Sequence, residues 1–533
     1  MKSAQVKLSL DPQLAAARGW TNPVVPGDHP DPTIVRVGSR FWASATSGEW
    51  SPQFPLFWSD DLARWTPSGA IFAQQPAWAE GSFWAPELVH DEVSDRLLVW
   101  YVARKRGGPL CIAVATSDVP EGPYIDHGPI VCQDDGSIDP CFARDEHGAP
   151  YLIWKEDGNS QGRPTPIWAQ ALSDDLLSLT GEKTQLIVND QPWEEGVVEG
   201  PYLLRHDGRF YMFYAGNTCC GRECRYSEGV ARADRLLGPW EKYPGNPLIG
   251  ANDHWRCPGH GTVVHGSAVG GAEADYLLYH AYPAGDTIYV GREAVLDEVA
   301  WPQTDHDGRT GWPSINAGSG TDAFGETPLI DFTDDFASMF LKPAWQWPVN
   351  TQPETTTGTA GLRLGIPLES PLSDRPVESA LIGVPRPAGD GYSATVWLHI
   401  DPEMDPRLWS GLSVVGDPFN TVGLGARGDA LILWERRGAH QAVMWRGEGL
   451  ARGEAVGLRV EHGGPGDGLQ FFYSHGADVW EKAGENYDPS ELPAWDRGLR
   501  IGLMLEGPRG LAARFQKFEM KTSKRLAEEC KSV

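Results

Sequence analysis

A strand-like segment recurs five times in the first 300 residues of the chain. Each copy is a run of aromatic and aliphatic residues that follows a turn, and the copies begin at Arg40, Arg96, Pro150, Arg209 and Asp275. The spacings between these positions are 56, 54, 59 and 66 residues. A repeat of this length, rich in β-forming residues, is typical of a propeller built from four-stranded blades. We therefore predict an all-β fold that begins with a five-bladed β-propeller over residues 1–320.

A second marker has the same period. It is a strand that ends in Asp, at Asp60, Asp118, Asp174 and Asp234, with spacings of 58, 56 and 60 residues. Two copies, ATSDVPEGPY (115–124) and ARADRLLGPW (231–240), align without a gap. The alternative fold, a β-sandwich with insertions, does not explain two markers that share one period.

A third marker places polar residues at one position of the repeat. It reads HPDP (29–32), WAPE (84–87), IDP (138–140), VEGP (198–201) and GHGT (259–262), and its polar residues are Asp31, Glu87, Asp139, Glu199 and His260. The innermost strand of each propeller blade lines the central channel. If this marker is that strand, its polar side chains converge at one end of the channel. Turn formation by Asp-Pro and Glu-Gly-Pro is the alternative interpretation. It would account for one copy, but not for acids in four.

Converging carboxyl groups favour glycoside hydrolysis. The reaction needs two carboxyl groups beside the scissile bond, one protonated to assist the leaving oxygen and one ionised. A third carboxylate nearby raises the pKa of the acid by like-charge repulsion. The chain also has 23 Trp residues, and sugars bind on flat apolar rings. The sequence therefore predicts a neutral, hydroxyl-rich oligosaccharide or polysaccharide substrate.

Composition argues against other partners. The formal net charge of −27 disfavours binding to a phosphate backbone, so no nucleic-acid partner is expected. No apolar run reaches the length of about 18 residues that a membrane span needs. Residues 1–10 lack the apolar segment of a signal peptide. This leaves open a cytoplasmic protein or a secreted one whose signal has been removed. The oligomeric state is not predicted.

Residues 321–533 lack the propeller markers. Alternating strands recur at 392–400, 430–437, 468–474, 499–507 and 512–520. Short strands with Gly and Pro turns at such intervals predict a β-sandwich domain.

The ordered set of motifs resembles glycoside hydrolase family 43. The resemblance covers about residues 20–316 and rests on NPVVPGDHPDP, GSFWAPELVH, SIDPCFARDEHG, VVEGPYLLRHDG, CPGHGTVV and VGREAVLDEVAWP. It implies a five-bladed propeller and an inverting, single-displacement mechanism. It also implies that Asp31 is the general base, that Asp139 orients the acid and tunes its pKa, and that Glu199 is the general acid.

The resemblance implies further site residues. Trp84 would be a wall for the sugar with Glu87 close behind it, Arg292 would contact a substrate hydroxyl, and His29 is counted among the substrate-binding residues. His260 resembles the residue that faces a water-coordinated central ion, often calcium, although the chemistry would require no cofactor. Structural roles remain open for three of these residues: Trp84 in the core, His260 in channel hydrogen bonds and Arg292 in a salt bridge.

The implied activity is an exo-acting hydrolase that releases a terminal pentose, with α-L-arabinofuranose favoured. A β-D-xylosidase and a non-catalytic sugar-binding propeller are the alternatives. The closing strand ARFQKFEM (513–520) resembles that of a concanavalin-like sandwich, a module that accompanies many family members. Three roles are open for such a module: it contributes a loop to the active-site rim, it binds sugar, or it has a purely structural role.

Two other clusters stand outside the motifs. Cys219, Cys220 and Cys224 form either a metal site or disulfides, and their spacing matches no common zinc pattern. Glu194 and Glu195 lie near Glu199 without the motif, so we expect both to be solvated.

Overall fold

The structure is a computed structural model that describes residues 20–285, 290–301, 308–315, 331–369, 379–385, 391–463, 467–476 and 479–523. Strands dominate these ranges, which confirms the all-β prediction. The helices within them are single 3₁₀ turns: η1 (Asn159–Gln161), η2 (Pro192–Glu194) and η4 (Pro489–Glu491). In these ranges no helix has the length and apolar character needed to cross a membrane.

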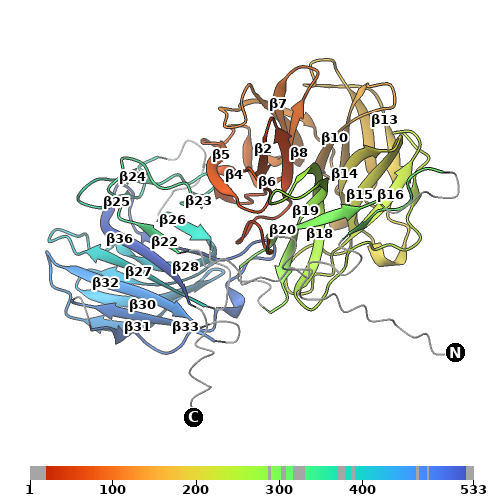
Figure 1. Ribbon diagram of the computed structural model, residues 1–533. Helices are drawn as coiled ribbons and strands as arrows, with labels where there is room; N and C mark the ends of the chain where they lie inside the picture. Colours follow the sequence, from red (N-terminus) through yellow and green to blue (C-terminus); the bar gives the residue numbers. More distant parts are fainter. Residues whose placement is uncertain are drawn as a thin grey trace, which may run out of the picture.

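Five four-stranded antiparallel sheets follow one another along the first half of the chain, in the red-to-green part of Figure 1. The first two sheets are β1 (Thr33–Val37), β2 (Arg40–Ser44), β4 (Gln53–Ser59), β5 (Thr66–Phe72), and β6 (Ala79–Asp91), β7 (Arg96–Lys105), β8 (Leu110–Ser117), β9 (Ile125–Val131). The third and fourth are β10 (Ser137–Arg144), β11 (Pro150–Glu156), β12 (Ile167–Leu172), β13 (Leu179–Ile187), and β14 (Val198–His206), β15 (Arg209–Gly216), β16 (Ser227–Ala233), β17 (Glu241–Lys242). The fifth is β18 (Trp255–Ser267), β19 (Glu273–Pro283), β20 (Glu293–Ala300), β21 (Ser314–Ile315).

The five sheets form a closed ring. The first strand of each sheet contacts the first strand of the next, and β1 contacts β18 to complete the cycle. The first described residues strengthen the closure. Val25 pairs with Ala294 of β20, and the Asn22 side chain exchanges hydrogen bonds of 3.0 and 2.9 Å with the backbone of Leu296. This is the arrangement predicted for a five-bladed propeller.

The third sequence marker lies at the innermost strands. In β6, β10, β14 and β18 the pairing register shifts at the marker, as a β-bulge does. Asp139 and His260 have φ angles of 55° and 51°, and Asp31, just before β1, has 52°. Such a backbone is tolerated best by Gly, Asn, Asp and His. A left-handed backbone interrupts the regular alternation of side chains along a strand, and these three side chains all line one cavity.

Two larger sheets make up the second half, in the green-to-blue part of Figure 1. One contains β22 (Phe332–Asp334), β24 (Glu354–Thr356), β25 (Leu362–Gly365), β27 (Gly391–His399), β32 (Ala455–His462), β33 (Leu469–Ser474), β34 (Glu481–Lys482) and β36 (Ala512–Ser523). The other contains β26 (Ser379–Pro385), β28 (Trp409–Asp417), β29 (Asn420–Arg427), β30 (Ala430–Arg437), β31 (His440–Glu448) and β35 (Arg500–Glu506). Both sheets bury apolar side chains in one shared core, as the predicted sandwich requires. The predicted domain boundary at 320/321 lies outside the described residues and stays a prediction.

The sandwich contacts the propeller. β23 (Trp347–Pro348) pairs with β3 (Trp50–Ser51) of the first repeat. Arg500 of β35 forms an ion pair with Asp28 at 3.0 Å, and both side chains are only 3% exposed. These contacts hold the sandwich against the propeller.

Candidate active site

One cavity of about 450 Å³ opens at the propeller axis. Asp31, Asp139 and Glu199 all line it, although they come from three different blades. Its other lining residues include Trp84, Lys155, Cys219, Cys220, His260, Arg292, Trp495 and Asp496. The predicted convergence of distant carboxyl groups is therefore present.

Asp31 lies in a positively charged, donor-rich environment. Its Oδ1 is 3.2 Å from the Arg292 guanidinium and 3.4 Å from Nδ1 of His260, and its Oδ2 accepts a 2.7 Å hydrogen bond from the Thr46 hydroxyl. Burial opposes ionisation, but the charge of Arg292 and the bond from His260 outweigh it and hold the pKa of Asp31 well below its usual range. Asp31 is therefore an ionised carboxylate.

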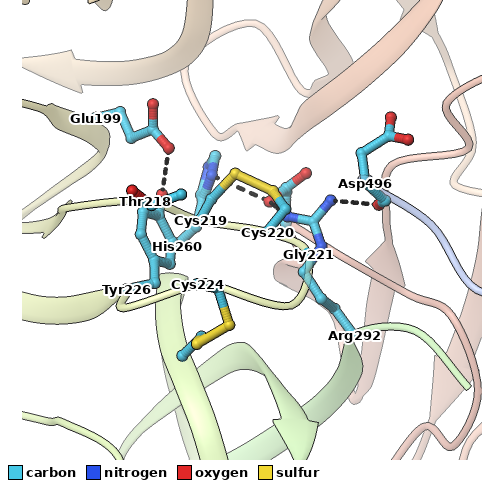
Figure 2. The surroundings of a disulfide bond; sticks show 12 residues. Glu199, Thr218, Cys219, Cys220, Gly221, Cys224, Tyr226, His260, Arg292 and Asp496 are labelled. Carbon is cyan, nitrogen blue, oxygen red and sulfur yellow. Dashed lines mark hydrogen bonds and ion pairs between the residues drawn. A yellow bond between two sulfur atoms is a disulfide. The ribbon is translucent and has the colours of Figure 1, made fainter. Parts of the chain in front are cut away.

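The carboxylate of Glu199 is held by two donors, one on each oxygen. Its Oε2 is 2.6 Å from Nζ of Lys155. Its Oε1 accepts a 2.8 Å hydrogen bond from the Tyr226 hydroxyl, which is drawn in Figure 2. Burial raises the pKa of Glu199, but the Lys155 ammonium and these hydrogen bonds lower it further than burial raises it. Lys155 is 1% exposed and also pairs with Asp157 at 2.9 Å.

Asp139 differs from both. Burial, together with the charge of Glu199, raises its pKa to about 6, against the opposing charges of His260 and Lys155. Its Oδ2 accepts a 2.8 Å hydrogen bond from the backbone N–H of Gly200. Asp139 thus fixes the peptide that directly follows Glu199.

Position 200 in the VEGP motif requires a glycine because His260 packs directly against it. Its φ is 57°, and a Cβ at this position would lie 2.8 Å from Cγ of the His260 ring. Any larger residue would push His260 away from the carboxylates that surround it.

His260 lies among three carboxylates that favour its charged form. Although burial disfavours its charge, Asp139, Asp31 and Glu199 raise its pKa to about 9. Over the described part of the chain, no three or more His, Cys, Asp and Glu side chains group as metal ligands do. A water-coordinated calcium ion that faces His260 stays a prediction.

Trp84 and Arg292 line the cavity as predicted, and both meet the sandwich. The Trp84 ring is perpendicular to the ring of Trp495, with centroids 6.4 Å apart. Arg292 donates a 3.1 Å hydrogen bond to the backbone oxygen of Asp496 (Figure 2). The sandwich thus contributes a loop to the cavity rim.

Two predicted substrate-binding residues do not line this cavity. His29 lies in a separate apolar cavity between propeller and sandwich, where its ring meets Phe57 edge-on at 5.0 Å. The left-handed backbone at Asp31 turns the two side chains of the HPDP motif in different directions. Glu87 is buried against Thr33, which donates a 3.2 Å hydrogen bond to it, and burial raises the pKa of Glu87 to about 8.

The clusters outside the motifs also have definite structures. Cys219 and Cys220 form a disulfide with each other, and Cys224 forms one with Cys257, so these cysteines are not metal ligands. Of the adjacent acids, Glu195 is exposed, but the expectation for Glu194 was wrong, because this residue is fully buried.

The buried Glu194 has four hydrogen-bonding partners. Its carboxylate accepts the backbone N–H groups of Asp190 and Gln191 at η2, the Tyr214 hydroxyl and the Lys242 ammonium. This satisfied network explains its burial, because a buried charge is tolerated when it is paired and hydrogen-bonded.

Sequence reasoning missed Lys155, Tyr226, Trp495 and Asp496. Only Lys155 could have been found in the sequence, since it is a charged residue directly after the apolar run YLIW. Tyr226 precedes its strand without a marker, and the other two residues lie almost 300 residues beyond Glu199 in the sequence.

Known proteins resemble the chain in sequence. A xylan 1,3-beta-xylosidase from a Vibrio species is 28% identical over 339 residues, which is 58% of this chain and 58% of that protein. A xylosidase/arabinosidase from Humicola insolens is 27% identical over 53% of this chain and 54% of its own length. An extracellular exo-alpha-(1->5)-L-arabinofuranosidase from Cellvibrio japonicus is 26% identical over 52% of this chain and 86% of its own. The chain thus spans just over half the length of the first two relatives.

Solved structures resemble the whole fold. The crystal structure of a xylan beta-1,4-xylosidase from Bacillus halodurans aligns with a TM-score of 0.77 over 94% of this chain and 100% of that one, at 22% identity. This likeness extends over the fold of nearly the whole chain. The model of the Glycosyl hydrolases family 43 matches residues 20–308, more than half of the chain. The chain therefore belongs to glycosyl hydrolase family 43.

Proposed function

We propose that the protein is an inverting exo-glycoside hydrolase that releases a terminal pentose from plant-type polysaccharides or oligosaccharides. The observation that carries the proposal is the single cavity lined by Asp31, Asp139 and Glu199. The three relatives described above are a xylosidase, a xylosidase/arabinosidase and an arabinofuranosidase by name, which supports a pentose. α-L-Arabinofuranoside is the favoured bond and β-D-xyloside the second candidate.

Asp31 is the proposed general base. An inverting mechanism needs a carboxylate that removes a proton from water as the water attacks the anomeric carbon. Arg292 and His260 keep Asp31 ionised, which suits this role. The same Arg292 has a second proposed task, contact with a sugar hydroxyl.

Glu199 is the proposed general acid, and Asp139 positions it. The acid must carry a proton when the glycosidic oxygen leaves. In the free protein Lys155 favours the ionised form of Glu199, whereas Asp139 has a raised pKa of about 6. We propose that Glu199 receives its proton when the sugar displaces water around it, because lost hydration disfavours the carboxylate.

The rim of the cavity supports exo action. Trp495 and Asp496 of the sandwich line the cavity together with the propeller residues. A rim built from both the propeller and the sandwich would close a groove into a pocket, which suits one terminal sugar. Trp84 forms one wall of this pocket.

The experiment is hydrolysis of an aryl α-L-arabinofuranoside and an aryl β-D-xyloside, followed by proton NMR of the first-formed sugar. Inversion yields the β-anomer from the arabinofuranoside and the α-anomer from the xyloside. A first-formed product of retained configuration would overturn the mechanism. Absence of cleavage in both substrates would overturn the pentosidase, and cleavage of the xyloside alone would select the second candidate.

A further inference from the structure

The loop of residues 217–224 enters the cavity but has no part in the roles above. Cys219 and Cys220, adjacent in the sequence, are joined by a disulfide and line the cavity with Glu199 and Arg292. In the view of Figure 2 the two sulfur atoms lie between these two side chains. Cys220 is 8% exposed and Cys219 is half-buried, so the disulfide presents part of its surface to the cavity.

The disulfide is held from the propeller side. Cys224, at the end of the loop, is bonded to Cys257 of β18, the strand that carries His260. The backbone N–H of Gly221 donates a 3.2 Å hydrogen bond to the Tyr282 hydroxyl of β19. The loop is therefore tied to the fifth blade.

The sandwich holds the loop from its other side. Arg222 donates a hydrogen bond to the backbone oxygen of Ser490. Gly221 has a φ of 80°, and a Cβ there would approach the backbone oxygen of Trp495 to 3.2 Å. With anchors on both sides, the disulfide is a preorganised wall, and preorganised walls bind ligands at low entropic cost.

The chemistry of this wall differs from that of its surroundings. Apart from apolar residues such as Trp84 and Trp495, the lining consists largely of charged donors and acceptors, which suit sugar hydroxyls. A pentose also presents C–H groups on the faces of its ring, and these need an apolar, polarisable surface. Sulfur atoms are soft and polarisable, and a disulfide has no N–H or O–H to leave unpaired.

We propose that the Cys219–Cys220 disulfide is a sugar-contacting surface of the cavity. The C–H groups of the terminal pentose pack on its two sulfur atoms while the hydroxyls meet the charged residues. This role rests on the proposed function, because it takes the ligand to be a sugar. It makes the loop a specificity determinant, since the position of the wall limits the size of the ring that fits.

The first test is protection of the disulfide by ligand in the wild-type protein. A water-soluble phosphine reduces a disulfide to two thiols while the phosphorus takes an oxygen atom from water. The reduction rate of each disulfide is followed by thiol alkylation and mass spectrometry, with and without saturating L-arabinose or D-xylose. We expect bound sugar to slow reduction of Cys219–Cys220 by about tenfold. The Cys111–Cys132 disulfide, which does not line the cavity, should be unaffected.

Calorimetric titration of the same sugars separates the outcomes. If a sugar binds and reduction of Cys219–Cys220 is not slowed, the disulfide is not a contact surface and this inference falls, while the hydrolase proposal stands. If neither sugar binds and neither aryl glycoside is cleaved, the hydrolase proposal falls and the inference falls with it.

The second test replaces the disulfide. The double variant Cys219→Ser, Cys220→Ser is expected to raise KM for the aryl glycoside by about tenfold and to change kcat by less than about threefold. The matched control is Cys111→Ser, Cys132→Ser, which also removes one disulfide and should leave KM within about twofold. An unchanged KM in the first variant would contradict the proposal. If that variant does not fold, the protection experiment on the wild-type protein decides alone.

Discussion

The ammonium group of Lys155 lies 2.6 Å from the carboxylate of Glu199, and the lysine is almost completely buried. This pair joins β11 of the third blade to β14 of the fourth, and both residues line the cavity. In the proposed mechanism Glu199 must be protonated, yet its nearest cation favours the anion. Lys155 therefore sets the upper pH at which the acid can act.

Replacement of Lys155 by Met tests this relationship. Loss of the cation should raise the pKa of Glu199, because the ionised form loses its partner while burial remains. The general acid then stays protonated to higher pH, so the alkaline limb of kcat/KM should move up by about one pH unit or more. The measurement is a pH profile of kcat/KM with an aryl glycoside.

The matched control is Lys183→Met. Lys183 pairs with Glu156 at 3.4 Å in the same blade, but its side chain is 36% exposed and lies outside the cavity lining. Its removal should leave both limbs in place. An alkaline limb that stays still or moves down in Lys155→Met would show that Glu199 is not the group that titrates there.

Replacement of Glu199 by Gln should act selectively on poor leaving groups. Without the acid, turnover of an unactivated disaccharide should fall by about 10³-fold, whereas an aryl glycoside with an acidic phenol should lose about tenfold or less. The comparison variant is Asp31→Asn, which should abolish both activities because both need the attacking water. Steady-state kcat on the two substrates decides, and equal losses in Glu199→Gln would contradict its role as acid.

Glu87 provides a test of stability against pH. Burial raises its pKa from 4.5 to about 8, so the folded protein retains a proton that the unfolded chain releases. Its contribution to stability is full below pH 4.5 and is lost as the pH rises toward 8. The amide side chain that Glu87→Gln introduces does not titrate. Between pH 5 and pH 8 the free energy of unfolding of the wild type should therefore fall by about 3 kcal/mol more than that of the variant.

Urea unfolding at the two pH values measures this difference. Glu92→Gln, at an exposed position just beyond the same strand, is the control and should follow the wild type. Parallel pH dependence of wild type and Glu87→Gln would show that Glu87 is ionised in the folded protein. Because Glu87 lies outside the cavity lining, KM should stay within about twofold in this variant.

The repeat and its motifs predicted the site residues that lie at the first strand of a blade. Each motif lies at the first strand of its blade, and the ring brings these strands together, so Asp31, Asp139 and Glu199 could be placed from spacing alone. The position of His29 could not be predicted in this way. His29 and Asp31 belong to one motif, but the backbone at Asp31 has a positive φ and the two side chains lie in different cavities.

The remainder of the site depends on packing between elements that carry no common pattern. Trp495 and Asp496 reach the cavity because the sandwich packs beside the propeller, and no periodicity in residues 321–533 encodes that contact. Whether Glu194 or Glu195 is buried depends on Tyr214 and Lys242 of other strands. Side-chain partners of this kind become visible only in three dimensions.

Trp495 tests the part of the site that comes from the sandwich. Its side chain is 60% exposed and its ring lies perpendicular to that of Trp84, so it is positioned to cover a sugar that rests on the propeller. Trp495→Ala should raise KM by about tenfold with a smaller change in kcat, because an apolar contact made equally in substrate and transition state affects binding.

Phe419→Ala, at a sandwich position that is 61% exposed and outside the cavity lining, is the matched control. Neither change should alter the free energy of unfolding by more than about 0.5 kcal/mol, since both side chains are exposed. A KM that is equal in the two variants would show that the substrate does not reach the sandwich.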